Sequence, residues 1–216
     1  MDYVFRLEDS VLKRGRGLLT IWNSSNTPDN PLRALPGPDG KAVSINLMMS
    51  ACLHETILIT CAVLDSPKPN RALLKSNLIS FPVIAGLMQI PGTEKLRLAD
   101  GDEAIKLAAQ ARFFEHIDSL KQEPMKARIT RLRGFRDEFL AHALDQDWSK
   151  TPPALGDITA LMDLACIMSG DCQLALFAKR VSLRPELMTV SESIEAVWRM
   201  LARRGDSAGH ASARDF

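Results

Sequence analysis

Apolar residues recur at steps of three and four along most of the chain, and no stretch sustains the alternation of a half-buried β-strand. That spacing is the period of a helix that buries one face. With 216 residues available for a core, it predicts an all-α fold, a helical bundle within one domain over residues 1–205. The expected helices cover residues 3–21, 44–64, 71–80, 83–90 and 104–120, a segment that begins near Pro124, residues 155–181, and a last helix from Arg184.

Two segments are predicted to lie outside the helices. Residues 23–40 collect Asn, Ser, Pro, Asp and Gly, the composition of a long surface loop. Residues 206–216 follow the last apolar stripe and are predicted to form a disordered tail. The last stripe itself consists of Leu187, Val190, Ile194, Val197, Trp198 and Leu201.

Residues 44–64 form the most apolar run of the chain. The run approaches the length of a transmembrane helix, but His54 and Glu55 lie together at its centre, where exposure to lipid would be costly. Because it is apolar almost all round, we expect the central buried helix here and no membrane association. His54 either forms a second catalytic pair with Glu55, lines a cleft, or is hydrogen-bonded at the helix edge, and the last is favoured.

Several classes of function lack support in the composition and motifs. The four cysteines, at positions 52, 61, 166 and 172, lie in apolar runs without Cys-x-x-Cys spacing, as buried thiols of a reducing cytoplasm do. The first residues are acidic and show no signal peptide, so a cytoplasmic location is expected. No phosphate-binding loop, dinucleotide-binding glycines, nucleophile elbow or His-Glu-x-x-His motif is present. We therefore expect neither a cofactor nor a metal site.

One helix carries a local concentration of positive charge. The net charge of +1 gives no general attraction to nucleic acid, so RNA binding requires a local basic patch. After Pro124, five basic residues follow without an intervening acid, which predicts contacts with RNA phosphates. The alternative is a solvated face, or local pairing such as Arg133 with Asp137. The basic run consists of Lys126, Arg128, Arg131, Arg133 and Arg136.

The same helix has an apolar stripe near which an arginine and a histidine lie. At about 100° per residue, Arg136 and His142 lie roughly 60° to either side of Phe139. A second copy packed antiparallel about a twofold axis near Phe139 would bring both copies of this pair into one cleft. A homodimer is therefore expected. The stripe consists of Met125, Ile129, Leu132, Phe135, Phe139 and Ala143.

The segment Arg-Asp-Glu-Phe-Leu-Ala-His at 136–142 resembles the signature of the HEPN superfamily, in the form of its abortive-infection, AbiU-type branch. That signature is an arginine, a polar residue, four further residues and a histidine, late in an all-helical domain. The resemblance implies a metal-independent endoribonuclease, a toxin or phage-defence effector, with Arg136, Asp137 and His142 in the catalytic site. It also implies an antitoxin or other protein partner. Some members only bind, so the alternative is a non-catalytic dimeric module for RNA or a protein.

The expected chemistry assigns one role to each residue. His142 transfers a proton as the ribose 2′-hydroxyl attacks phosphorus, and Arg136 binds the phosphoryl oxygens. Asp137 is expected to orient Arg136 of the partner chain, and Glu138 to raise the pKa of His142. The opposing interpretation pairs Arg136 with a carboxylate while His142 caps or fills the helix edge. His116, on the preceding helix, either faces the site or is solvent-exposed, and exposure is favoured.

Overall fold

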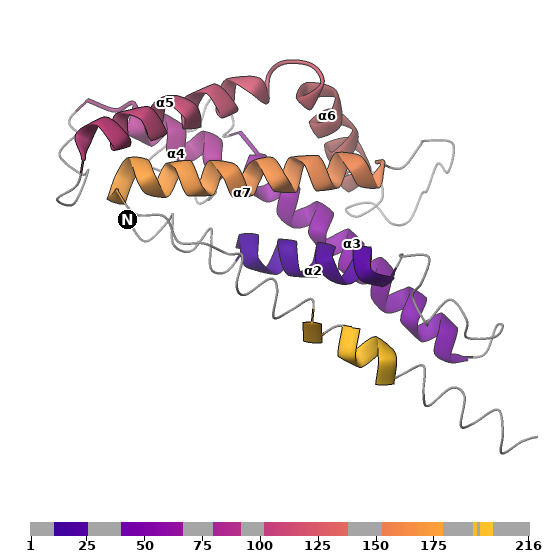
Figure 1. Ribbon diagram of the computed structural model, residues 1–216. Coiled ribbons are helices and arrows are strands. Elements are labelled where there is room, and N and C mark those ends of the chain that lie inside the picture. The colour runs from indigo at the N-terminus through magenta and orange to yellow at the C-terminus, as the bar shows by residue number, and fades with distance from the viewer. Residues whose placement is uncertain are drawn as a thin grey trace, which may run out of the picture. The chain divides into compact units, whose positions relative to one another are not determined.

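The computed structural model describes residues 11–25, 40–66, 80–91, 102–137, 153–178, 192–193 and 195–200. Within these ranges the regular structure is helical and no strand occurs, which confirms the predicted all-α class (Figure 1). A short helical segment at 195–200 follows the longer helices. The longer helices are α2 (Lys13–Ser25), α3 (Gly40–Leu64), α4 (Phe81–Met88), α5 (Glu103–Ser119), α6 (Met125–Phe135) and α7 (Leu155–Phe177).

The chain divides into two compact units by its backbone contacts. Met1–Gly15 and Thr56–Ser182 form the larger unit, and Arg16–Glu55 with Leu183–Phe216 form the smaller one. Helices α2 and α3 are therefore each divided between the two units. The single domain over residues 1–205 stays a prediction.

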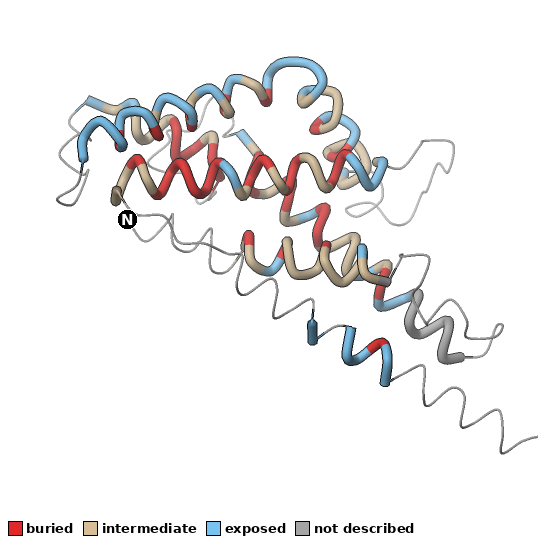
Figure 2. Tube along the Cα trace, viewed as in Figure 1, coloured by how far each residue is buried: buried red, intermediate tan, exposed pale blue. Residues whose placement is uncertain are grey.

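The core of the larger unit is built on α7, which packs against α5 and α6. Side chains of α7 are buried along most of its length (Figure 2). Phe113 of α5 is fully buried and meets Phe81 of α4 edge to face, with ring centroids 6.1 Å apart. Helix α7 runs unbroken from Leu155 to Phe177, and its C-cap residue Ala178 lies in the left-handed region.

The prediction that residues 44–64 form the central buried helix was wrong in part. In α3 the segment that ends at Leu64 is largely buried, but Leu47, Met48 and Leu58 are exposed. Of the described helices, α7 has the most buried residues. An apolar helix has no preferred face of its own, so the neighbouring helices decide which of its residues are covered.

In the smaller unit, a hydrogen bond joins the C-terminal helical segment to α2. The indole N–H of Trp198 donates to the hydroxyl of Ser24 at 3.1 Å, and the Trp198 ring is buried. Val197, predicted in the same buried stripe, is exposed instead. The loop predicted at 23–40 is also shorter at both ends, because α2 continues to Ser25 and α3 begins at Gly40. Residues 26–39 and the predicted tail 206–216 lie outside the described residues.

Helix α4 begins earlier than the sequence predicts, and the buried face of α5 includes a charged residue. Helix α4 begins at Phe81, two residues before the predicted start at residue 83, and Pro82 lies in its first turn, where its missing N–H has no helical partner to lose. On α5, the apolar side chains of Ile105 and Leu107 are exposed, while Lys106 is buried. The face of α5 toward the core carries Lys106, Ala109, Phe113 and Ile117, which share one helical stripe.

By length and composition alone, two segments of the described helices are long and apolar enough to cross a membrane. They are Leu47–Leu64 in α3, of which 39% is buried, and Leu155–Phe177, which is α7 and 61% buried. The burial of α7 is that of a core helix packed against other helices, as the contacts with α5 and α6 require.

Candidate functional site

Helix α6 orients the side chains of the basic run. Ile129 and Leu132 are buried and Met125 and Phe135 are half-buried, so the predicted stripe is confirmed over the described part of this helix. The remaining stripe residues, Phe139 and Ala143, lie outside the described residues. With one face held against the core, the arginines of α6 extend to either side of it.

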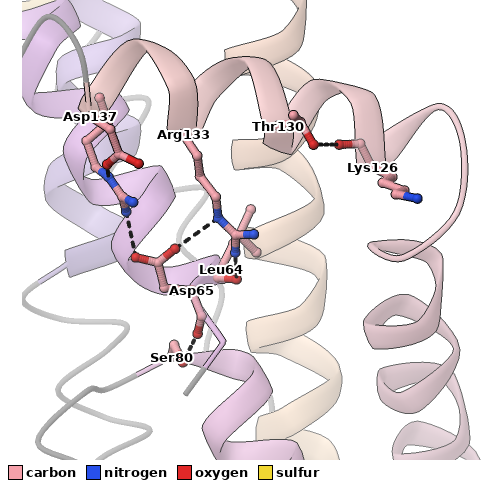
Figure 3. Close-up of polar contacts among 8 residues, drawn as sticks. Leu64, Asp65, Ser80, Lys126, Thr130, Arg133 and Asp137 are labelled. Atoms are coloured by element: carbon pink, nitrogen blue, oxygen red, sulfur yellow. Dashed lines mark hydrogen bonds and ion pairs between the residues drawn. The ribbon is translucent and has the colours of Figure 1, made fainter. Parts of the chain in front are cut away.

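Two of these arginines meet at a single aspartate (Figure 3). Arg133 donates from Nε to Oδ1 of Asp65 at 3.0 Å, and Arg136 donates from Nη1 to Oδ2 at 2.6 Å. Each carboxylate oxygen of Asp65 thus receives one guanidinium. Arg136 also donates from Nε to Oδ1 of Asp137 at 2.8 Å. We call these four residues, Asp65, Arg133, Arg136 and Asp137, the Asp65 cluster.

Backbone groups at the end of α3 complete the Asp65 cluster. Arg133 donates from Nη2 to the carbonyl oxygen of Leu64 at 3.0 Å, and the hydroxyl of Ser80 donates to the carbonyl of Asp65 at 2.6 Å. The last carbonyls of a helix have no partner within it and favour a nearby cation. Arg133 therefore caps the C-terminus of α3 while it binds Asp65.

The Asp65 cluster is electrically balanced and partly open to solvent. Its two arginines and two aspartates sum to zero formal charge, and the side chains of Arg136 and Asp65 are 25% and 24% exposed. Hydrogen bonds to Asp137 and then to Asp65 raise the pKa of Arg136, so the guanidinium stays charged at every physiological pH. Burial raises the pKa of the neighbouring Cys61 thiol to about 11, so this group is not a nucleophile at neutral pH.

The other two arginines of the basic run bind Asp157 in the first turn of α7. Arg131 donates from Nε and Nη2 to the two oxygens of Asp157, at 2.8 and 3.0 Å, a bidentate fork. Arg128 adds its Nε at 3.4 Å from Oδ1. The hydrogen bond from Arg131 lowers the pKa of Asp157, whose side chain is only 9% exposed. Both arginines therefore tie α6 to α7.

A third aspartate, Asp171 of α7, contacts an arginine and a histidine of α5. Arg112 donates from Nε and Nη2 to Oδ1 of Asp171, at 3.1 and 2.8 Å. His116 places Nε2 at 3.5 Å from Oδ2 and is 29% exposed. His116 is therefore half-buried beside a buried carboxylate, and its predicted solvent exposure holds only in part.

The predicted RNA-binding residues thus separate into two groups. All four arginines lie on an internal carboxylate, whereas Lys126 is exposed at the far end of α6 and has no carboxylate partner within the described ranges (Figure 3). The predicted pairing of Arg133 with Asp137 does not occur. Asp137 instead binds Arg136 of its own chain, and Arg133 binds Asp65.

The predicted catalytic histidine, His142, and its neighbour Glu138 lie outside the described residues. His54 is half-buried, and it belongs to the smaller unit together with Glu55. In the part of the chain that the structure describes, no three His, Cys, Asp or Glu side chains gather in a way that would hold a metal ion. The candidate site therefore rests on Arg136 and its carboxylate partners.

The partners that sequence reasoning missed are Asp65 and Asp157. They lie 68 residues before Arg133 and 26 residues after Arg131, well outside the range of helical spacing rules. The available signal for Asp65 was its position as the first polar residue after the most apolar run.

No family model, curated protein or solved structure matches this chain. The resemblance to HEPN proteins is therefore carried by residues 136–142 of this sequence alone.

Proposed function

We propose that this chain is a metal-independent endoribonuclease of the HEPN type, acting in the cytoplasm as a homodimer and as a toxin or phage-defence effector. RNA is its substrate, and an antitoxin or other protein is its partner. The observation that supports this is the state of Arg136: a charged guanidinium held by Asp65 and Asp137 and still 25% exposed, six residues before His142. A fixed, accessible arginine suits the binding of a phosphoryl group.

The proposed reaction needs no metal and no covalent enzyme intermediate. The ribose 2′-oxygen attacks the adjacent phosphorus as its proton passes to His142, and the bond from phosphorus to the 5′-oxygen breaks. The leaving 5′-oxygen takes up a proton from solvent, to which His142 returns the proton it accepted, and Arg136 balances the charge that develops on the phosphoryl oxygens. The products are a 2′,3′-cyclic phosphate and a 5′-hydroxyl.

A second candidate function is a non-catalytic helical dimer that binds RNA or a protein. The observation that favours it is the pairing of Arg128, Arg131, Arg133 and Arg136 with internal carboxylates. Arginines in these positions hold α6 against the end of α3 and against α7. Among the described residues of the basic run, Lys126 is then the cation that is exposed to solvent and has no carboxylate partner.

The test is incubation of the purified protein with total cellular RNA in excess EDTA, followed by analysis of the RNA ends. The variants are His142→Ala, Arg136→Gln and, as a matched control, His210→Ala, which removes a histidine outside the motif. We expect cyclic-phosphate ends from the wild type and the control, and a loss of at least about 100-fold in rate for His142→Ala.

Each other outcome contradicts part of the proposal. Fragments with 3′-hydroxyl and 5′-phosphate ends would exclude this chemistry. Absence of cleavage by a folded dimer would favour the binding module, and a monomer in native mass spectrometry would count against both functions.

A further inference from the structure

We propose that Arg133 and Arg136 form a cradle for one RNA phosphodiester, and that Asp65 occupies this cradle in the free protein and competes with RNA for it. The inference rests on the proposed function only in taking RNA as the ligand. It adds a residue outside the motif, Asp65, that sets how tightly the site binds.

The geometry of the two arginines suits one anion with two oxygens. They are three residues apart, Arg133 in the last turn of α6 and Arg136 at its C-cap, on neighbouring positions of one face. One guanidinium nitrogen of each binds a different oxygen of Asp65, at 3.0 and 2.6 Å. A phosphodiester also presents two charged, non-bridging oxygens, and guanidinium groups bind carboxylate and phosphate with the same fork of donors.

An exchange of Asp65 for a phosphodiester conserves charge. With Asp65 present, the Asp65 cluster is neutral, and if this side chain turned away the two arginines and Asp137 would leave one positive charge. A phosphodiester brings one negative charge and restores the balance. Arg133 keeps its bond to the Leu64 carbonyl in either state, so the end of α3 stays capped.

Accessibility separates this site from the similar one at Asp157. Asp65 lies just beyond α3, outside the helix, and its side chain is 24% exposed. Asp157 lies within α7 and its side chain is 9% exposed. Rotation of the Asp65 side chain would open a cradle to solvent, whereas Asp157, in the first turn of α7, is the more buried of the two carboxylates. The exchangeable carboxylate is therefore Asp65.

The experiment measures binding without cleavage. The probe is a fluorescein-labelled single-stranded RNA in which every 2′-hydroxyl is methylated, so the attacking group is blocked, and binding is followed by fluorescence anisotropy in EDTA. Asp65→Asn keeps the shape of the side chain and removes its charge. The matched control is Asp118→Asn, the same change at an exposed aspartate of α5 that pairs with Lys121.

We expect Asp65→Asn to bind the probe about tenfold more tightly than the wild type, the effect of roughly one gained charge-assisted hydrogen bond. Asp118→Asn should change affinity less than about twofold, because one exposed charge outside the contact adds little. The gain should vanish in the double variant Asp65→Asn with Arg136→Gln. Unchanged or weaker binding by Asp65→Asn, or a gain that persists without Arg136, would overturn the inference.

A second measurement covers the case in which Asp65→Asn does not fold by circular dichroism. In ¹⁵N-labelled wild-type protein, saturation with the same RNA should shift the Nε–Hε signal of Arg133, assigned with Arg133→Lys. The signal of Arg131, bound to Asp157, should stay in place. An Arg133 signal unmoved at saturation would refute the exchange.

Cleavage of unmodified RNA separates this inference from the proposed function. Tighter binding by Asp65→Asn without cleavage by either protein would reject the ribonuclease and keep the cradle. Cleavage that depends on His142, without a gain in binding from Asp65→Asn, would keep the ribonuclease and reject Asp65 as a competitor.

Discussion

Two glycines near the start of α2 differ sharply in their surroundings, and replacing each by alanine should change stability in different directions. A Cβ atom at Gly15 would lie 2.7 Å from Cγ2 of Ile59 and 2.7 Å from Cε of Met162. Among the described residues, a Cβ atom at Gly17 would meet nothing within 4 Å. Both positions are helical, so alanine improves the intrinsic helix propensity equally at each.

The magnitude follows from two opposing terms. Exchanging glycine for alanine within a helix stabilises it by about 1 kcal/mol, which is the full effect expected of Gly17→Ala. At Gly15 the added methyl overpacks the core, which costs about 1–3 kcal/mol. The flexible end of Met162 can move aside, but the branched Ile59 is held at its first torsion, so the cost persists. The two variants should therefore differ by about 1–3 kcal/mol, with Gly17→Ala the more stable.

The assay is thermal unfolding of the wild type and both variants, followed by far-ultraviolet circular dichroism. For a chain of this size, about 1 kcal/mol corresponds to roughly 2–4 °C in Tm, so Gly17→Ala should melt above the wild type by about that amount. Gly15→Ala should melt clearly below Gly17→Ala. Equal stabilisation by both substitutions would show that the start of α2 does not pack closely on Ile59 and Met162, and would refute this reasoning.

Two further predictions concern titratable groups. Asp157→Asn should lower stability toward urea at pH 7, because the hydrogen bond from Arg131 holds the pKa of Asp157 below its usual value of about 4. A lowered pKa gives stabilisation that is present above about pH 4 and lost as the pH falls through the folded-state value, so wild type and variant should converge in acid; a constant difference would contradict this. Cys61 should react with Ellman's reagent at pH 8 more slowly than the half-buried Cys166, since burial raises the pKa of Cys61 to about 11. Equal rates in single-cysteine variants would contradict the burial of Cys61.

The local features of the fold could be predicted because their causes are local. The apolar period gave the all-α class and the start of α7 at Leu155, and α5 begins within one residue of its predicted start. Asp102, whose side chain accepts a hydrogen bond from the Ala104 amide at 2.9 Å, explains that boundary, since an aspartate at this position caps a helix. The buried face of α6 was predictable for the same reason: Ile129 and Leu132 lie on one stripe.

The features that could not be predicted from the sequence depend on which helices become neighbours. On α5, contact with α7 buried the stripe that includes Lys106 and Phe113 and left the apolar Ile105 and Leu107 exposed. The partners in the ion pairs could not be predicted for the same reason. A helical spacing rule offers Asp137 to Arg133, but the carboxylate that binds Arg133 is 68 residues away in sequence.

The pairing of α6 arginines explains how a basic helix belongs to a chain with a net charge of only +1. The arginines come as two pairs three residues apart, 128 with 131 and 133 with 136, and each pair shares one aspartate supplied by α7 or by the end of α3. The four arginines therefore bind carboxylates of neighbouring segments of the same chain, and these ion pairs hold the helices together. Apart from the exposed Lys126, nucleic acid would meet positive charge on this helix where a carboxylate turns away from its arginines, and its greater exposure makes Asp65 a better candidate for that than Asp157. A basic run in sequence thus predicts an RNA-binding face only after its internal counterions have been located.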